Sequence, residues 1–153
     1  MKFDHVDREL IAALQNNARV SNKELAAQIG IAPSTCLVRV RRLTEHGVVR
    51  GYHAEVDPHS VGVGLQAIVA IQLQRHSRQV LEEFRTDVLT LPEVVCVYHI
   101  AGANDYLVHV AARDADHLRE LTMTSFTTRP EVARMQTTLI FEQVDTHRLP
   151  ILV

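Results

Sequence analysis

The sequence predicts an α+β protein in which three short helices precede a separate antiparallel sheet with two helices. Three observations predict this arrangement. Apolar residues recur at helical spacing as far as Gly47, and they alternate as in strands from Leu65 onward. The segment "DPHSVGVG" between these regions holds one proline and two glycines, as linkers do. Two stretches, "LPEVVCVY" and "RPEVARMQ", repeat one pattern that leads from a helix into a strand.

The first 30 residues predict two helices. Val6, Leu10 and Leu14 are spaced for one helix face, and either Asp4 or Asp7 caps the start of this helix. The stretch "SNKE" is a capping box, in which Ser21 accepts a hydrogen bond from a backbone N–H and Glu24 reaches back. Gly30 then ends the second helix at a position that suits a positive φ.

A third helix follows at once. Pro33 fits its first turn, where the missing N–H costs nothing, and Gly47 stops it. Two helices joined by a tight glycine-containing turn predict helix-turn-helix geometry over residues 1–50. The stretch "VVRGYHAEVDP" predicts a short strand or wing, and we expect residues 51–64 to form this wing and a linker.

Residues 65–153 predict a second domain. "LQAIVAIQLQ" is an alternating strand, and a helix is expected from His76 to Leu91. "VVCVYHIA" and "YLVHVAA" predict two strands of a hairpin around "GAND", and a second helix is expected from Ala115 to Thr127. "ARMQTTLIFEQV" predicts the last strand. The order β-α-β-β-α-β predicts a ferredoxin-like fold.

Composition excludes several classes of protein. The chain has 153 residues, of which 46% are hydrophobic, so a packed core is expected and long disorder is not. No apolar run approaches the roughly 20 residues that span a bilayer. The opening "MKFDHVDREL" has acids where a signal peptide is apolar. Cys36 and Cys96 lie in apolar surroundings and are expected to be reduced thiols, so the sequence predicts a cytoplasmic protein.

Positive charge gathers on the third predicted helix, although the formal net charge of the chain is −2. On a helical wheel one apolar arc, directed inward, holds Cys36, Leu37, Val40 and Leu43. The opposite, exposed arc is centred on Thr35, Val38 and Arg42. Ser34 and Arg41 lie on one flank of it, and Arg39 lies on the other.

Such a surface suits the major groove of DNA, because small residues let the backbone approach base edges and arginine forks onto guanine or clamps phosphate. The alternative is a solvated cationic face, and Arg39 could instead form an ion pair within the domain. The capped second helix, the Gly30 turn and the Pro33 start favour DNA binding with the arginine-rich side turned outward. The candidate DNA-binding residues are Ser21, Asn22, Ser34, Thr35, Val38, Arg39, Arg41 and Arg42.

Several stretches together resemble the Lrp/AsnC family, the leucine-responsive or feast/famine transcription regulators. The Asp-x-x-Asp opening, "NARVSNKELA", "CLVRVRRL" and "GVVRGYHA" match that family's N-terminal domain in order and spacing. "AGANDYL" and the closing "TTLIFEQV" match its effector domain. The resemblance covers nearly the whole chain. It implies a DNA-binding regulator whose dimers assemble into tetramers or octamers and whose DNA binding or assembly responds to a small molecule, foremost an amino acid.

The hairpin loop "AGANDY" is the candidate effector site. Gly102 permits close approach of a ligand, nearby backbone N–H groups suit a carboxylate, and Asn104 and Asp105 can accept from an ammonium group. Taken alone, this stretch is also simply a good turn. The resemblance implies that the loop borders an effector site between neighbouring dimers and that the last strand contributes. The candidates are Gly102, Ala103, Asn104, Asp105, Tyr106, Thr137 and Thr138.

One position departs from the family pattern. The family often has an acidic or polar residue directly after the glycine, and here that residue is Ala103. The identity of the effector therefore cannot be transferred from the family.

The predicted strands also bear on assembly. Neither face of "VVCVYHIA" or "YLVHVAA" is properly polar, so one face is expected under the helices and the other against a second copy of the sheet. A two-fold dimer would also space two recognition helices for DNA. His99 and His109 are possible cross-strand neighbours. Packing at the sheet is favoured over a metal site there, because no cysteine or carboxylate at useful spacing joins them.

Three functions compete at this level. The first is a regulator whose DNA binding is gated by a ligand through linkage. The second is an architectural DNA-binding protein without an effector. The third is an enzyme on a ferredoxin-like scaffold, since fold does not settle function. No nucleophile with a paired base, phosphate loop or metal-ligand cluster is recognisable, so the chain is expected not to be an enzyme and to need no cofactor beyond an amino acid effector.

Overall fold

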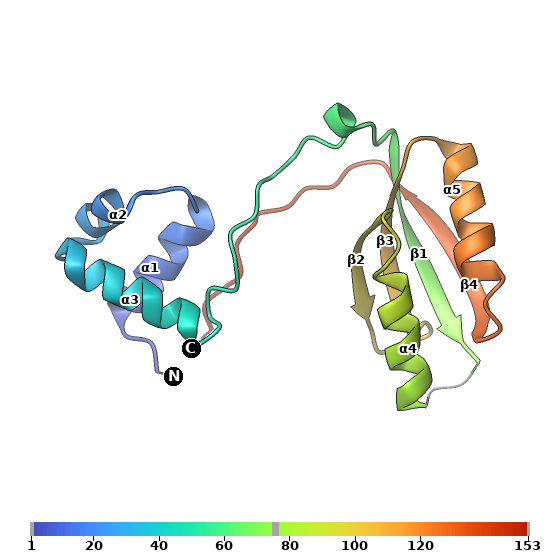
Figure 1. Cartoon of the computed structure of the whole chain (residues 1–153), viewed down its shortest axis with the longest axis horizontal. Coiled ribbons are helices and arrows are strands. Elements are labelled where there is room, and N and C mark those ends of the chain that lie inside the picture. The colour runs from blue at the N-terminus through green and yellow to red at the C-terminus, as the bar shows by residue number, and fades with distance from the viewer. Residues whose placement is uncertain (1, 75–76, 153) are drawn as a thin grey trace. The chain divides into compact units, whose positions relative to one another are not determined.

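The computed structural model describes residues 2–74 and 77–152, and these residues form two units (Figure 1). The first unit comprises residues 2–55 together with residues 144–152, and the second is Val56–Gln143. The chain first passes between the units within the predicted linker, 51–64. The predicted second domain runs to residue 153, whereas the structure groups the final segment with the first unit.

Three helices form the first unit: α1 (His5–Asn16), α2 (Asn22–Ile29) and α3 (Pro33–Glu45). Asp4 caps α1 and forms a capping box with Asp7, so both acids that the sequence offered as caps take part. Ser21 and Glu24 form the predicted capping box of α2, and Gly30 ends that helix at φ 75°. Pro33 occupies the first turn of α3, as predicted.

The predicted wing strand is absent from the structure. Residues 51–57 have no regular secondary structure, and a short 3-10 turn, η1 (His59–Val61), follows. The strand prediction was wrong because β-forming residues need a pairing partner, and the described chain offers none to this segment. The three helices bury one apolar core, which holds Leu10, Leu14, Leu25, Ala26, Cys36 and Leu43. Of these, Leu10, Leu14, Cys36 and Leu43 were predicted to face inward.

The second unit has the predicted order of elements. It contains β1 (Leu65–Leu73), α4 (Arg78–Val88), β2 (Val94–His99), β3 (Tyr106–Ala112), α5 (Ala115–Thr122), a π-helical turn η2 (Met123–Thr127) and β4 (Val132–Ile140). The antiparallel sheet has the order β2-β3-β1-β4. The helix predicted from His76 begins at Arg78 with Ser77 as its cap, and His76 lies outside the described residues.

Both helices of the second unit cover the same face of the sheet (Figure 1). Phe84 and Val88 of α4 and Leu118 and Leu121 of α5 pack on the core-facing residues of β1 and β3. Pro92 and Pro130 each stand two residues before a strand, so the internal repeat has a structural counterpart. The last strand is shorter than predicted, because it ends at Ile140.

The final segment contacts α1. The Gln15 side chain donates to the Leu149 carbonyl at 3.3 Å and accepts from the Leu149 N–H at 2.6 Å, so one amide satisfies both backbone groups. Arg148 hydrogen-bonds Asn16, and His147 lies 3.5 Å from a Glu55 carboxylate oxygen. The sequence carries no local signal for these contacts, since they join residues more than ninety positions apart.

Gly64 makes a backbone contact that no other residue type allows. A Cβ at this position would lie 2.1 Å from the carbonyl oxygen of Arg113 and 3.2 Å from its carbonyl carbon. We expect Gly64→Ala to lower the free energy of unfolding of the second unit by about 1–3 kcal/mol, because the backbone must shift to admit the methyl group. Thermal unfolding followed by circular dichroism checks this. The contradicting result is an unchanged unfolding temperature.

Candidate nucleic-acid interface and ligand domain

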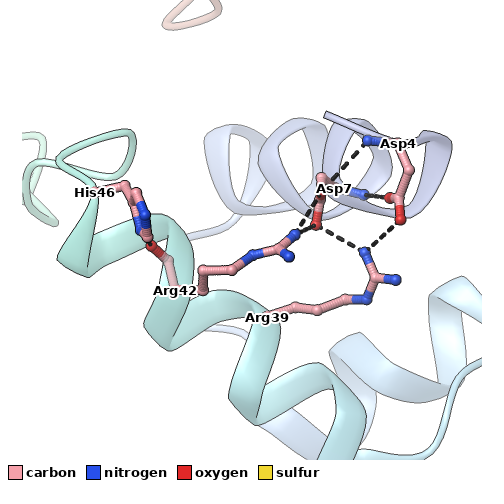
Figure 2. A network of polar contacts seen from close by, with 5 residues as sticks. All are labelled: Asp4, Asp7, Arg39, Arg42 and His46. Carbon is pink, nitrogen blue, oxygen red and sulfur yellow. Dashed lines mark hydrogen bonds and ion pairs between the residues drawn. The ribbon is translucent and has the colours of Figure 1, made fainter. Parts of the chain in front are cut away.

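The arginines of α3 do not all face outward. The Arg39 guanidinium donates to Asp4 Oδ2 at 2.7 Å and to Asp7 Oδ1 at 2.9 Å. Arg42 donates from one nitrogen to both oxygens of Asp7, at 2.9 and 2.8 Å (Figure 2). Both side chains therefore turn toward the start of α1. For Arg39 the structure shows the alternative, an ion pair within the domain, and for Arg42 the expectation of an outward direction was wrong.

The centre of this network is Asp7. Its side chain is 1% exposed, and it also accepts from the backbone N–H of Asp4 at 3.3 Å. Asp4 is more open, and the N–H of Asp7 together with the Arg39 guanidinium lowers the pKa of its carboxyl. Both carboxylates raise the pKa of Arg39. Two acids thus neutralise two of the three arginines on α3.

Arg41 remains on the outer side. Its side chain is 78% exposed and forms an ion pair with Glu45, four residues on along the same helix, at 2.7 Å. An exposed pair of this kind contributes little and gives way easily to a phosphate or a base. Ser34, Thr35 and Val38 are exposed as predicted, so they share the accessible face of α3 with Arg41.

Leu37 also lies on this accessible face. It is 60% exposed, close to the 66% of Val38, although the helical wheel assigned it to the inner arc. The wheel placed Leu37 at the margin of that arc, and helices α1 and α2 cover only the stripe around Cys36 and Leu43. Exposed aliphatic side chains at this place suit contact with thymine methyl groups.

Ser21 and Asn22 form hydrogen bonds at the start of α2. The Ser21 hydroxyl accepts from the Glu24 N–H at 3.2 Å, and it lowers the pKa of the Glu24 carboxyl by hydrogen bonding to it. Asn22 donates from its amide to the Pro33 carbonyl at 2.8 Å, which joins the start of α2 to the start of α3. The structure thus gives Ser21 the role of capping α2 and gives Asn22 a role in positioning α3.

The hairpin loop is fastened to the end of β1. The Asp105 N–H donates to the Ile71 carbonyl at 2.8 Å, and the Asp105 carboxylate accepts from the Leu73 N–H at 2.7 Å. The Asp105 carbonyl accepts from the Ile100 N–H at 2.9 Å, which closes the loop. Gly102, with φ 146°, and Ala103 are exposed at the tip, and Asn104 is half-buried.

The other effector candidates do not gather at this loop. Tyr106 is 2% exposed, lies 5.1 Å from the Phe84 ring between centroids, and donates to the Leu81 carbonyl at 2.8 Å. Burial raises the pKa of its hydroxyl, so the structure makes Tyr106 a core residue. Thr137 and Thr138 are exposed on β4, where they pair with the middle of β1 rather than with its end.

Two surface hollows of the second unit lie away from the loop. One, of about 170 Å³, lies between the start of β1 and the end of β4, and the other, of about 470 Å³, lies along α5. No residue of the loop lines either of these two hollows.

The sheet face opposite the helices is left uncovered by the described chain. We call it the open sheet face, and its members follow from the strand register: Gln66, Ile68, Ala70, Gln72, Cys96, Tyr98, Leu107, His109, Ala111, Arg134, Gln136, Thr138 and Ile140. Its middle carries the apolar residues Ile68, Ala70 and Leu107, and one end of it is polar. Within it, His109 is 5% exposed and donates to the Gln66 side-chain oxygen at 2.8 Å, and burial lowers the pKa of its imidazole.

His99 and His109 are not neighbours. His99 pairs with Tyr106 and stacks on its ring at 4.9 Å between centroids, whereas His109 pairs with Cys96 on the opposite face. The predicted proximity was wrong because the hairpin centres nearer Gly102 than expected. A bulge between Val94 and Cys96 also breaks the predicted alternation, since Val94 and Val97 both pair with core residues. No group of three possible metal ligands occurs in residues 2–74 and 77–152.

Two family models match the chain in the order of its two units. A winged helix-turn-helix DNA-binding model matches residues 3–50, and a model of the Lrp/AsnC ligand binding domain matches residues 66–150. The chain belongs to the Lrp/AsnC family. It is accordingly a DNA-binding transcriptional regulator with a ligand-binding domain, and the resemblance seen in the sequence is confirmed.

Relatives cover nearly the whole of this Lrp/AsnC chain. The HTH-type transcriptional regulator AldR of Mycolicibacterium smegmatis is 45% identical over 142 residues, which are 93% of this chain and 83% of the relative. The leucine-responsive regulatory protein of Escherichia coli K12 is 35% identical over 142 residues, 93% of this chain and 87% of that protein. These relatives are transcriptional regulators.

Solved structures agree with the fold. A transcriptional regulator from Neisseria meningitidis, solved as its L-Met complex, has a TM-score of 0.87 at 28% identity and covers 94% of this chain and 93% of its own. MtbAldR has a TM-score of 0.77 at 36% identity, covering 97% of this chain and 100% of its own. None of the described helices is long and apolar enough to cross a membrane.

Proposed function

We propose that this regulator reads duplex DNA with the exposed face of α3 and that an amino acid, bound beside the hairpin loop, changes this binding. One observation carries the proposal: a capped helix-turn-helix unit and a Lrp/AsnC ligand-binding unit lie on one chain. The L-Met complex of the Neisseria relative supports an amino acid as the class of ligand.

The hairpin loop is the proposed binding site for the amino acid. Asp105 holds the loop against β1 and offers a carboxylate beside exposed backbone at Gly102 and Ala103. A carboxylate and backbone N–H groups together suit the ammonium and carboxylate of an amino acid. Because the tip of the loop at Gly102 and Ala103 is exposed in the single chain, we propose that a neighbouring copy completes the site.

Assembly follows from the open sheet face. The apolar middle of this face, around Ile68, Ala70 and Leu107, favours a cover, and a second copy of the same face supplies one with two-fold symmetry. We propose a homodimer formed in this way, which assembles further into tetramers or octamers. We also propose that the protein acts in the cytoplasm on nucleoid DNA and that it catalyses no reaction.

Selection of bound duplex from random sequence, with and without a pool of amino acids, tests the proposal. We expect one enriched motif with two-fold symmetry and a change in its recovery when the right amino acid is present. Enrichment that ignores every amino acid would indicate an architectural protein without an effector. If the recovered duplexes share no sequence preference, α3 does not read the DNA sequence and the proposal is wrong.

A single substitution tests the loop. Asp105→Asn removes the charge while its amide oxygen can still accept from the Leu73 N–H. We expect the amino acid concentration for half-maximal effect to rise at least tenfold, because one charge-assisted bond is lost, at a cost of roughly 1.5–3 kcal/mol. Titration of the DNA-bound protein with the identified amino acid measures this. An unchanged dose curve would show that Asp105 serves only the loop.

A further inference from the structure

Asp7 stands apart from the other acidic residues of the described chain, since it is the only carboxylate there that is buried. It sits in the first turn of α1, yet its two guanidinium partners come from α3, more than thirty residues later. Figure 2 shows the hydrogen bonds from both guanidinium groups to Asp7, together with the bond from Arg39 to Asp4. Arg42 has both of its bonds to the single carboxylate of Asp7.

A buried carboxylate keeps its partners, because an unpaired charge away from water is very costly. Arg42 contacts this group through Nη2 alone, and extending its guanidinium outward toward a guanine would cost these two charge-assisted bonds. Arg39 would have to give up Asp7 and Asp4 together. Arg41 faces no such cost, since its partner Glu45 is an exposed neighbour on the same helix.

We propose that Asp7 is a positioning residue that holds Arg39 and Arg42 away from base edges and so leaves base reading to Ser34, Thr35, Leu37, Val38 and Arg41. The proposal deepens the proposed function, because it rests on α3 as the reading helix. It reverses the expectation that Arg42 contacts bases. The pairing also neutralises two positive charges, which limits binding that is independent of sequence.

Asp7→Asn tests this directly, since it keeps the size of the side chain and removes the charge that holds Arg42. We expect affinity for random duplex at low salt to rise about three- to tenfold as Arg42 becomes free to contact phosphate. The dependence of log K on log salt concentration should steepen by about 0.9 for the added phosphate contact. The ratio of specific to random binding should fall accordingly.

Asp4→Asn is the matched control. It is the same substitution three residues earlier, at an exposed acid that pairs only with Arg39, and asparagine also serves as a helix cap. We expect an unchanged salt dependence, because Asp7 still holds both arginines. If Asp7→Asn only lowers the unfolding temperature and weakens specific and random binding equally, with an unchanged salt slope, then Asp7 has a merely structural role and the proposal fails.

Arg42→Ala and Arg41→Ala complete the test, and neither depends on the stability of the Asp7 variant. We expect the selected DNA motif to be unchanged for Arg42→Ala and to lose preference at one position for Arg41→Ala. A relaxed motif for Arg42→Ala would overturn the proposal, as would a salt slope lower by about one. Failure of the unaltered protein to bind any duplex would instead reject α3 as the reading helix.

Discussion

Leu107→Glu is expected to dissociate the proposed dimer. Leu107 lies on the open sheet face, opposite Ala70 on one neighbouring strand and Tyr98 on the other. In a face-to-face pair of sheets, each copy would bring one glutamate into the interface beside Ala70 and Tyr98, which offer no cation, and both carboxylates would lose water. We expect the dissociation constant of the dimer to rise at least 100-fold, equivalent to about 3 kcal/mol.

Sedimentation of the purified variant over a range of concentrations measures this effect. Leu139→Glu is the matched control, because Leu139 is 49% exposed on β4 and pairs with Ala67, on the other side of the sheet. It introduces the same charge without touching the open sheet face. An unchanged mass for Leu107→Glu, with dissociation for Leu139→Glu, would place the interface on the helix-covered side.

Loss of the dimer should also weaken DNA binding. A two-fold dimer presents two copies of α3 to two half-sites, and linking them makes the second binding event intramolecular. We therefore expect Leu107→Glu to bind a single half-site as the unaltered chain does, while its affinity for the full symmetric site falls. This result would separate the assembly role of the sheet from the reading role of α3.

The helices and the order of strands could be predicted because their signals are local. Ser21 with Glu24, Gly30 and Pro33 fix the ends of α2 and α3 within a few residues, and no tertiary contact overrides them. Pro92 and Pro130 mark the starts of β2 and β4 in the same way. Register is different, because a bulge at the start of β2 leaves no trace in the sequence.

The destination of the arginines could not be predicted from a helical wheel. A wheel gives the direction of the Cα–Cβ bond, whereas a guanidinium lies several bonds farther out and follows the available carboxylates. Arg39 and Arg42 are spaced by three residues, as are Asp4 and Asp7. This shared spacing lets two carboxylates on α1 face two guanidinium groups on α3. It was the one feature of the sequence that could have indicated these ion pairs.

Phe84→Ala is expected to have the largest effect on stability. The Phe84 side chain is 1% exposed under the sheet, and its ring lies near Tyr106 and beneath the Arg129 guanidinium, 5.6 Å from the ring centroid. Removing a buried ring forfeits its transfer free energy and leaves a cavity, at about 3–5 kcal/mol. Because the first unit has a separate core, its unfolding should be unaffected by this loss.

Calorimetry resolves this expectation if the two units unfold in separate transitions. We expect the transition of the second unit to move to lower temperature, while the transition of the first unit and the affinity of a half-site for α3 stay the same. Leu89→Ala is the matched control, since Leu89 follows α4 directly and is 57% exposed, so its removal should change stability by no more than about 0.5 kcal/mol. A shift of both transitions to lower temperature would instead show that the two units stabilise each other. An effector bound to the second unit could then act on the first unit by changing its stability alone.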